Sequence, residues 1–157
     1  MTRSAEPSRL AASDDAPEVA ALLHRFNTEY DEPSPGADVL EPRVRQHIDR
    51  ELSVFLLAGP RDVGIAQLRF RDYLFTGAPT CYLEELYVVP HRRGEGHGRT
   101  LLATAIELAR ERGATTMELG TALDDTAARA LYVSLGFSNF EKEGDPGTQM
   151  LYYEREL

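Results

Sequence analysis

The stretch CYLEELYVVPHRRGEGHGRTLLATAIELARER, residues 81–112, decides the fold of this chain. Its first nine residues are rich in aromatic and branched side chains, which suit a half-buried β-strand. Pro90 follows directly, and the strand is expected to end there because a proline cannot donate a hydrogen bond to a ladder. Leucines and alanines then recur over residues 101–109 at the spacing of one apolar helix face. The stretch therefore predicts a strand, a tight turn and a long helix.

Three glycines, Gly94, Gly96 and Gly98, separate the expected strand from the expected helix. Glycines at the mouth of a helix let an anion approach free backbone N–H groups and the positive end of the helix dipole. Positive charge suited to phosphate is supplied nearby by Arg92, Arg93 and Arg99. The spacing fits neither a Walker loop nor the dinucleotide-binding fingerprint. A phosphate cradle is the functional interpretation, and a plain connecting turn is the alternative.

Residues 93–98 follow the pattern R-x-x-G-x-G, and the strand before them ends as L-Y-V-x-P. This combination resembles the pyrophosphate-binding motif of the GNAT superfamily of acyl-CoA-dependent N-acetyltransferases. The matching strand positions are Leu86, Tyr87, Val88 and Pro90. His97 stands where relatives commonly carry an aliphatic residue, and we interpret it as a local variation rather than a catalytic base. Glu95 is expected to point to solvent, because a carboxylate facing the phosphates would repel them.

A second match lies at residues 124–137, DDTAARALYVSLGF. By itself this segment predicts an amphipathic helix that ends at a glycine cap. It also resembles the last GNAT motif, N-x-x-A-x-x-L/F-Y-x-x-x-G-F, with matches at Ala128, Leu131, Tyr132, Gly136 and Phe137. Asp125 stands where the family usually has asparagine, so it could bond the pantetheine arm only as an acceptor. Two motifs in the expected order identify the chain as a member of this superfamily.

Composition and charge limit the classes of function. The 157 residues are expected to form one domain, residues 1–157, with the 42% hydrophobic and 27% charged content of a soluble protein. A net charge of −9 argues against a nucleic acid partner, because binding phosphodiester chains needs a basic face. No apolar run approaches the ~18 residues of a membrane span, and no signal peptide is apparent. We therefore expect no membrane partner and a cytoplasmic location.

Metal and disulfide chemistry is not expected either. Cys81 is the only cysteine, which excludes an internal disulfide and a thiolate metal cluster, and it is expected to be buried in its strand. The four histidines lie far apart in the sequence, and none forms an i,i+4 ligand pair with a carboxylate. The sequence thus predicts no metal. Relatives are often dimers, so the resemblance implies a homodimer.

The remaining segments predict a mixed α/β (α+β) domain. Strands are expected at residues 9–12, 54–58, 64–73, 81–89, 115–119 and 149–154, and further helices at about 16–30, 38–50 and 124–135. Residues 1–8 are expected to be disordered and residues 141–147 irregular. The GNAT resemblance implies a central mixed, mostly antiparallel sheet of about six to seven strands. It also implies that strands 4 and 5 splay apart and that four helices flank the sheet.

The resemblance further implies that acetyl-CoA, as cosubstrate, lies in the opening between the splayed strands with its pyrophosphate on the glycine loop. Backbone N–H groups of the fourth strand would bond the acetyl carbonyl, where negative charge grows in the transition state. The cofactor-binding residues implied in this way are Leu86, Tyr87, Val88, Arg93, Gly94, Glu95, Gly96, His97, Gly98, Arg99, Asp125 and Ala128.

Acetyl transfer to an amine requires two proton movements. An amine with a pKa of about 10 must lose a proton before it attacks, and a thiolate leaves more easily once protonated. By resemblance Tyr132 is the general acid. Glu84 and Glu85 are the candidate bases, directly or through a water, and resemblance to polyamine acetyltransferases favours Glu84, whose counterpart contacts the substrate. Because adjacent strand residues face opposite sides, only one of the two is expected to enter the cleft. The structural alternative is a packed tyrosine and ordinary edge-facing carboxylates.

The acceptor is expected to be a small cationic amine, such as a polyamine, an aminoglycoside or an amino-acid derivative. In GNAT enzymes the first two helices and their connecting loop usually wall the acceptor site, and this region carries Glu29, Tyr30 and Asp31. Carboxylates beside an aromatic ring suit an ammonium group, whereas a solvated acidic loop is the alternative. Two other functions stay open: a protein acetyltransferase acting on a lysine or an N-terminus, and a non-catalytic acyl-CoA sensor, against which Tyr132 weighs.

Overall fold

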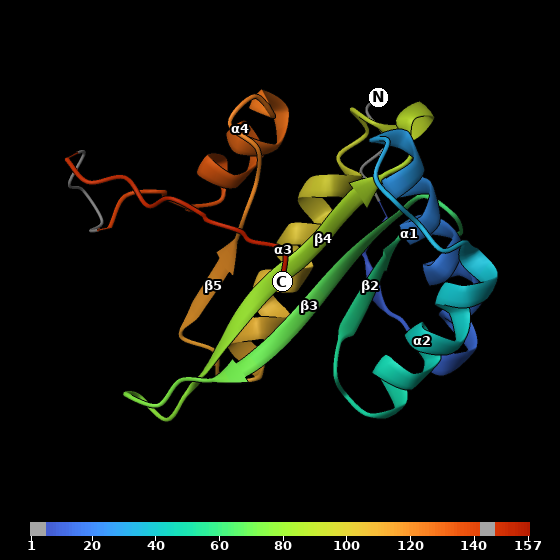
Figure 1. Ribbon diagram of the computed structural model, residues 1–157, viewed down its shortest axis with the longest axis horizontal. Coiled ribbons are helices and arrows are strands. Elements are labelled where there is room, and N and C mark those ends of the chain that lie inside the picture. Colours follow the sequence, from blue (N-terminus) through green and yellow to red (C-terminus); the bar gives the residue numbers. More distant parts are fainter. Residues whose placement is uncertain (1–5, 142–146) are drawn as a thin grey trace. The chain divides into compact units, whose positions relative to one another are not determined.

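A computed structural model describes residues 6–141 and 147–157, and the chain divides into two compact units, Met1–Leu119 and Gly120–Leu157. Figure 1 labels the helices α1 to α4 and the strands β2 to β5. The first unit holds β1 (Arg9–Leu10), the 3₁₀ turn η1 (Ser13–Asp15), α1 (Ala16–Glu29), α2 (Ala37–Asp49), β2 (Val54–Ala58), β3 (Gly64–Asp72), β4 (Pro79–Val88), the 3₁₀ turn η2 (Pro90–Arg92), α3 (His97–Glu111) and β5 (Thr116–Leu119). The second unit holds α4 (Thr126–Ser134).

The first unit is built on a five-stranded sheet in the order β1-β2-β3-β4-β5. The strands β1 to β4 are antiparallel neighbours, and β5 pairs with β4 in parallel. The mixed, mostly antiparallel sheet and the four α-helices confirm the expected architecture. The expected count of six to seven strands is too high, because the described residues form five.

The expected strand at residues 149–154 is the one that the described chain does not form. Gln149 makes only an isolated bridge with Phe140. The side chains of Met150 to Tyr153 are more than half exposed, so this segment lacks the buried face that holds a strand in a sheet. Of the segments expected to lack regular structure, residues 1–5 and 142–146 lie outside the described chain.

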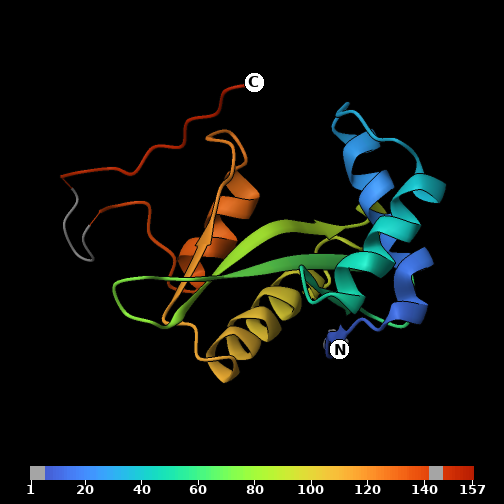
Figure 2. The same ribbon diagram turned by 60° about the horizontal axis from the view of Figure 1, so that its bottom comes forward.

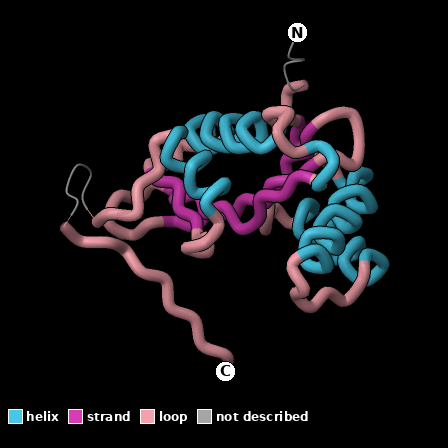
Figure 3. The backbone as a smooth tube through the Cα atoms, turned by 90° about the horizontal axis from the view of Figure 1, so that it is seen from above, coloured by secondary structure: helices cyan, strands magenta, loops and turns pink. Residues whose placement is uncertain are grey.

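Two layers of helix cover the sheet of the first unit. α1 and α2 lie side by side (Figure 3) and pack on the face that carries Phe55, Leu57, Ile65 and Tyr87. The alternate strand residues, such as Leu56 and Leu68, are fully buried on the other face. There α3 runs along β2, β3 and β4 (Figure 2) and contributes the buried side chains Leu101, Leu102 and Ala105. The apolar helix spacing in the sequence thus corresponds to a real core-facing stripe.

β5 pairs with only the first half of β4. They pair only over Thr80–Leu83 and Thr116–Leu119, while β4 continues to Val88. Over residues 84–88, β4 has β3 on one edge and no described strand on the other. This is the splay that the sequence resemblance implied. Its consequence is a row of backbone groups on β4 that a neighbouring strand does not occupy.

A β-bulge interrupts β4 at the same place. Leu83 lies opposite Leu68 and Glu85 lies opposite the next β3 residue, Gln67, so Glu84 is an extra residue without a partner. Paired residues share a face of the sheet, and β3 keeps its regular alternation. Leu83 therefore faces α3 with Leu68, whereas Glu85 faces the α1 and α2 side with Gln67. Side chains of β4 after the bulge therefore point to the face opposite to the one that regular alternation from Leu83 would give.

In the second unit, α4 begins at a capped end. The Asp125 carboxylate accepts a hydrogen bond from the Ala128 backbone N–H at 3.1 Å, which satisfies one of the unpaired donors of the first turn. The helix ends two residues before Gly136, whose φ of 88° lies in the left-handed region. Its bounds are about two residues shorter at the start than the expected 124–135. None of its side chains is fully buried.

Candidate active site

The glycine loop leaves backbone donors open at the start of α3. Gly94 and Gly96 have φ values of 80° and 89°, a conformation that favours glycine. Gly96 is the N-cap residue of α3 and provides no side chain to cap the helix, so the N–H groups of the first turn have no acceptor within the helix. A Cβ built on Gly94 would meet no atom within 4 Å, so this side of the loop is open. Open backbone donors at the start of a helix suit an anionic group such as a phosphate.

Three side chains of the loop region, Arg92, Glu95 and His97, already contact one another. Arg92 Nε donates to Glu95 Oε2 at 2.8 Å. His97 Nε2 lies 3.1 Å from the same oxygen and 3.1 Å from Arg92 Nη2. The hydrogen bond from Arg92, followed by that from His97, lowers the pKa of Glu95. Glu95 is exposed, as expected, but it also neutralises Arg92, a role that the sequence did not indicate.

His97 is more than a local variation at the surface. It is only 4% exposed, and its Nδ1 atom is buried without a hydrogen-bond partner in the described chain. The side chain opens α3 and bonds back to the loop through Nε2 alone. Through Nε2, the imidazole links the start of α3 to Arg92 in η2 and to Glu95. The sequence analysis assigned His97 to the loop, whereas the structure makes it the first residue of α3, and the sequence gave no signal of its burial.

Arg93 joins the end of α1 to the end of β4. Its Nε donates to the Val88 backbone oxygen at 2.8 Å, and its Nη2 donates to Glu29 Oε2 at 2.5 Å. The guanidinium also lies 5.7 Å from the centre of the Tyr87 ring. Arg93, which was expected to bind the cofactor, thus forms an ion pair with Glu29, which was expected to bind the substrate. The negative charge of the Glu29 carboxylate is therefore already balanced by Arg93.

Three aromatic rings lie in contact beside the Arg93–Glu29 ion pair. Phe26 stacks on Tyr87 with ring centres 5.1 Å apart, and Tyr30 meets Phe26 edge-on at 5.4 Å. Tyr30 is 55% exposed and follows the last residue of α1. Asp31, the next residue, is exposed and has a left-handed φ of 55°. The structure therefore brings the predicted residues Tyr30 and Asp31 to an exposed rim beside the β4 end.

Glu84 and Glu85 lie on the same face of the sheet, which contradicts the expected alternation. Glu84 Oε1 lies 3.5 Å from Arg69 Nη1, and Arg69 is two residues from Gln67, the partner of Glu85. The expectation failed because it assumed regular pairing, and the bulge breaks that pairing. Both carboxylates therefore belong to the α1 and α2 side, where β4 has left β5.

The two carboxylates differ in their surroundings. Glu84 is exposed and paired with Arg69. Glu85 is half-buried, and its carboxylate has no hydrogen-bond or ion-pair partner within residues 6–141 and 147–157. Desolvation by burial, helped by the charge of Glu84, raises the pKa of Glu85 to about 7. A carboxyl with such a pKa accepts and releases a proton at neutral pH.

Gln67, the partner of Glu85 on β3, begins a chain of three polar residues that the sequence did not single out. Gln67 donates from Nε2 to Ser53 Oγ at 3.0 Å, and Ser53 Oγ lies 2.9 Å from His47 Nδ1. Ser53 is only 4% exposed. The available signal was Gln67, a polar residue at a core-facing position of an alternating strand, but alternation alone does not reveal its partner.

In the second unit, Tyr132 lies on α4 with its ring edge-on to Phe137, at 6.0 Å between centres. Burial, followed by the charge of Asp125, raises the pKa of Tyr132 to about 12, so the hydroxyl is protonated at neutral pH. Asp125 and Ala128, both expected at the cofactor, are joined by the capping hydrogen bond of α4. The Asp125 carboxylate therefore already has a local role as a helix cap.

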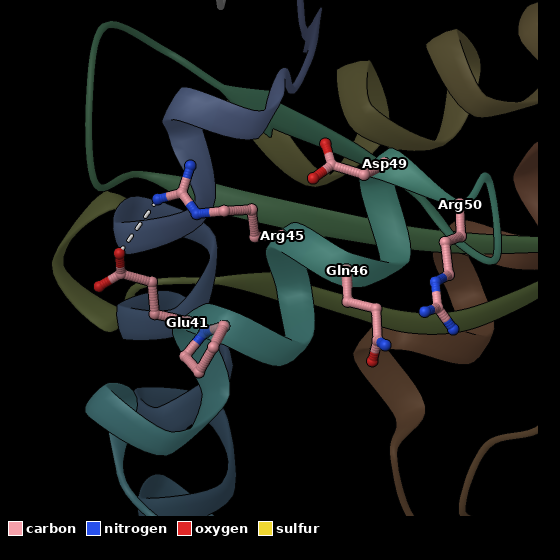
Figure 4. A pocket seen from close by; sticks show the side chains of 6 residues that line it. Glu41, Arg45, Gln46, Asp49 and Arg50 are labelled. Carbon is pink, nitrogen blue, oxygen red and sulfur yellow. Dashed lines mark hydrogen bonds and ion pairs between the residues drawn. The ribbon is translucent and has the colours of Figure 1, made fainter.

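A hollow elsewhere in the first unit contains none of the predicted site residues. This hollow, of about 360 Å³, lies on α2 and is lined by Glu41, Pro42, Arg45, Gln46, Asp49 and Arg50 (Figure 4). It mixes both charge signs. Among the described residues, no group of three His, Cys, Asp or Glu is placed to hold a metal ion. No described helix has the length and apolar character needed to cross a membrane. Cys81 is buried, and burial raises the pKa of its thiol to about 11.

Comparison with known proteins agrees with this geometry. Residues 18–137 match the sequence profile of the acetyltransferase (GNAT) family. The chain belongs to the GNAT acetyltransferase family. The profile spans both compact units and includes the glycine loop and α4.

Individual GNAT relatives cover nearly the whole chain. Aminoglycoside N(6')-acetyltransferase type 1 of Stenotrophomonas maltophilia is 31% identical over 147 residues, 90% of this chain and 92% of the relative. Aminoalkylphosphonate N-acetyltransferase of Salmonella typhimurium is 30% identical over 134 residues, 82% of each chain. A crystal structure of a protein from Arthrobacter sp. FB24, assigned as an acetyltransferase, superimposes with a TM-score of 0.87 and 42% identity. It covers 100% of this chain and 99% of that chain.

Proposed function

We propose that this GNAT protein is an N-acetyltransferase that moves an acetyl group from acetyl-CoA to the primary amine of a small cationic molecule. The observation that carries the proposal is Glu85. It is a half-buried carboxyl with a pKa of about 7, on the strand segment that has lost its neighbour β5. A base of this kind suits removal of a proton from an ammonium group at neutral pH.

The residues for holding acetyl-CoA are those of the β4 end and the glycine loop. Acetyl-CoA, when bound, supplies the acetyl group and a thiolate leaving group. The open N–H groups at the start of α3 suit its diphosphate, and the backbone of residues 86–88 offers donors for its carbonyl and pantetheine arm. Arg93 and Arg92 are held by Glu29 and Glu95 at the surface, where solvent screens ion pairs and each contributes little. Such pairs exchange easily for phosphate oxygens.

Protons move at two side chains in this proposal. Glu85 takes a proton from the incoming ammonium, directly or through a water, and is favoured over Glu84 because Arg69 holds Glu84 in an ion pair. Tyr132 gives its proton to the departing sulfur, a role supported by the family motif and by a pKa of about 12, which keeps the hydroxyl protonated. The carboxyl with the lower pKa acts as base and the phenol with the higher pKa as acid.

A small cationic amine is favoured by the charge at the end of α1 and by the relatives. Asp31 and Glu32 are exposed beside Tyr30, so an ammonium group meets negative charge and an aromatic face at this rim. Glu29 is assigned as a brace for Arg93 rather than as a substrate ligand. The two named relatives acetylate an aminoglycoside and an aminoalkylphosphonate, both of which carry amines.

An amine panel with acetyl-CoA tests the proposal. Release of the CoA thiol is followed with putrescine, spermidine, kanamycin, an aminoalkylphosphonate, neutral and acidic amines, and a lysine-containing peptide. Turnover of the cationic small amines is expected. Turnover of the peptide alone would instead make the chain a protein acetyltransferase, and CoA binding without any turnover would make it a sensor.

A further inference from the structure

The base proposed above lies at one end of a polar chain that crosses three elements. Gln67 on β3 is the register partner of Glu85, and antiparallel partners place their Cβ atoms about 4.5–5.5 Å apart on the same face. Gln67 Nε2 donates to Ser53 Oγ at 3.0 Å. Ser53 precedes β2, and its hydroxyl lies 2.9 Å from Nδ1 of His47 on α2. The chain therefore runs from α2 through the core to the face of Glu85.

The direction of these hydrogen bonds determines how the Gln67 amide is turned. An amide Nε2 can only donate, so Ser53 Oγ accepts from Gln67 and its own hydrogen is left for His47 Nδ1. Ser53 is 4% exposed and its backbone N–H bonds the His47 carbonyl oxygen, so this anchor is held inside the fold. The bond to Ser53 uses one of the two N–H groups of the Gln67 amide and fixes the plane of that amide, and the carbonyl oxygen has no hydrogen-bond partner among the described residues.

Two open acceptors consequently lie next to each other at the β4 bulge. Within residues 6–141 and 147–157, neither Gln67 Oε1 nor the Glu85 carboxylate has a hydrogen-bond partner, and neither is a buried unsatisfied group. Both are therefore reachable from solvent. An amide oxygen beside a carboxylate cannot satisfy it, but both can accept from a third group that carries several N–H donors. A primary ammonium has three.

We propose that Gln67 is a substrate-binding residue: its carbonyl oxygen and the Glu85 carboxylate together receive the ammonium group of the acceptor, and Ser53 and His47 position Gln67 for this contact. This inference rests on the proposed acetyl transfer to a primary amine. Glu85 takes one proton of the ammonium, while Gln67 holds a second N–H and so orients the nitrogen. The pair selects primary over N-methylated amines, because a methyl group removes a donor and adds bulk at the same nitrogen.

Steady-state kinetics with Gln67→Met tests this assignment. Methionine keeps the length of the side chain and removes the acceptor. Loss of one hydrogen bond to a charged group is expected to raise KM for the best primary amine of the panel about tenfold or more, with little change in KM for acetyl-CoA. The preference for that amine over its N-methyl derivative is expected to shrink. Gln67→Glu retains an acceptor oxygen and is expected to retain the preference. Gln46→Met makes the same change on the exposed outer face of α2 and serves as the matched control.

The possible outcomes separate this inference from the function on which it rests. An unchanged KM in an active Gln67→Met enzyme would overturn the assignment of Gln67 and leave the acetyltransferase proposal standing. Equal losses for the primary and the N-methylated amine would also overturn it, because they would indicate a structural defect rather than a lost acceptor. A wild-type protein that acetylates no amine would overturn the proposed function, and this inference with it.

Discussion

The two segments that carry the family motifs are built in different ways. The first, β4 with the glycine loop and α3, is set in the core: α3 buries five residues, and the loop is closed by His97, Arg92 and Glu95. The second, α4, has no fully buried residue, and Asp125 caps it locally. In the proposed function, the first motif holds the cofactor through backbone N–H groups at the start of α3. The second motif contributes a single hydroxyl, on Tyr132, as the proposed general acid. We expect substitutions in the first segment to affect binding and stability, and those in the second to affect turnover.

Tyr132→Phe is expected to have the largest effect. General acid catalysis contributes roughly 100- to 10,000-fold, so kcat should fall within that range when the hydroxyl is removed. Because no residue of α4 is fully buried and the ring remains, the melting temperature and the affinity for CoA should stay close to wild type. Kinetics and calorimetric titration with CoA measure both. Wild-type turnover by this variant would remove Tyr132 from the mechanism.

Glu85→Gln tests whether the first segment also carries chemistry on a side chain. We expect kcat/KM to fall by about 100-fold or more. In the wild type, kcat/KM should rise as the pH increases through about 7, because Glu85 must be ionised to act as base, and the variant should lose this limb. A wild-type profile whose acidic limb persists in Glu85→Gln would assign the base elsewhere.

The same substitution has a stability signature of known sign. The pKa of Glu85 is raised from 4.5 to about 7 in the folded protein, so ionising it opposes folding. This penalty is absent below pH 4.5, grows between pH 4.5 and 7, and is complete above pH 7. Glu85→Gln should therefore be more stable than wild type at pH 8 but not at pH 4, as measured by urea unfolding.

Gly94→Ala and Gly113→Ala form a matched pair for the backbone site. Their φ values are 80° and 79°, and a Cβ at either position meets no atom within 4 Å. Each substitution should cost about 1–2 kcal/mol of folding free energy, because alanine is strained in this conformation. Only Gly94→Ala should also weaken CoA binding, by about tenfold, since its Cβ projects into the open side of the loop. Equal CoA affinity in both variants would place the diphosphate elsewhere.

Glu29→Gln is expected to have the smallest effect. It breaks the ion pair with Arg93, whose side chain is 42% exposed, so the expected loss of stability is about 0.5 kcal/mol. The KM for the amine should change less than about twofold, since a partly exposed pair contributes little. A tenfold rise in that KM would return Glu29 to the substrate site, as the sequence first suggested.

Elements whose signals are local could be predicted from the sequence. Strand 54–58 and the starts of β3 and the glycine loop follow from alternation, proline and glycine, and each matches the structure. The position of Glu85 could not be predicted in this way. Its face depends on the pairing of β4 with β3, and a bulge is a property of two strands together. For the same reason, the sequence could not predict that Arg93 pairs with Glu29 or that Gln67 pairs with Ser53. These partners lie 64 and 14 residues apart in the chain.

Because Glu84 is an extra residue in β4, its deletion should leave the pairing of β4 with β3 intact. Removing Glu84 leaves Leu83 opposite Leu68 and Glu85 opposite Gln67, so the rest of the strand keeps its neighbours. What disappears is the kink and the unpaired backbone unit that comes with it. A chain shortened by this one residue would be a folded scaffold with an altered reaction centre. Protein engineers could use it to separate what the sheet needs for assembly from what it needs for turnover.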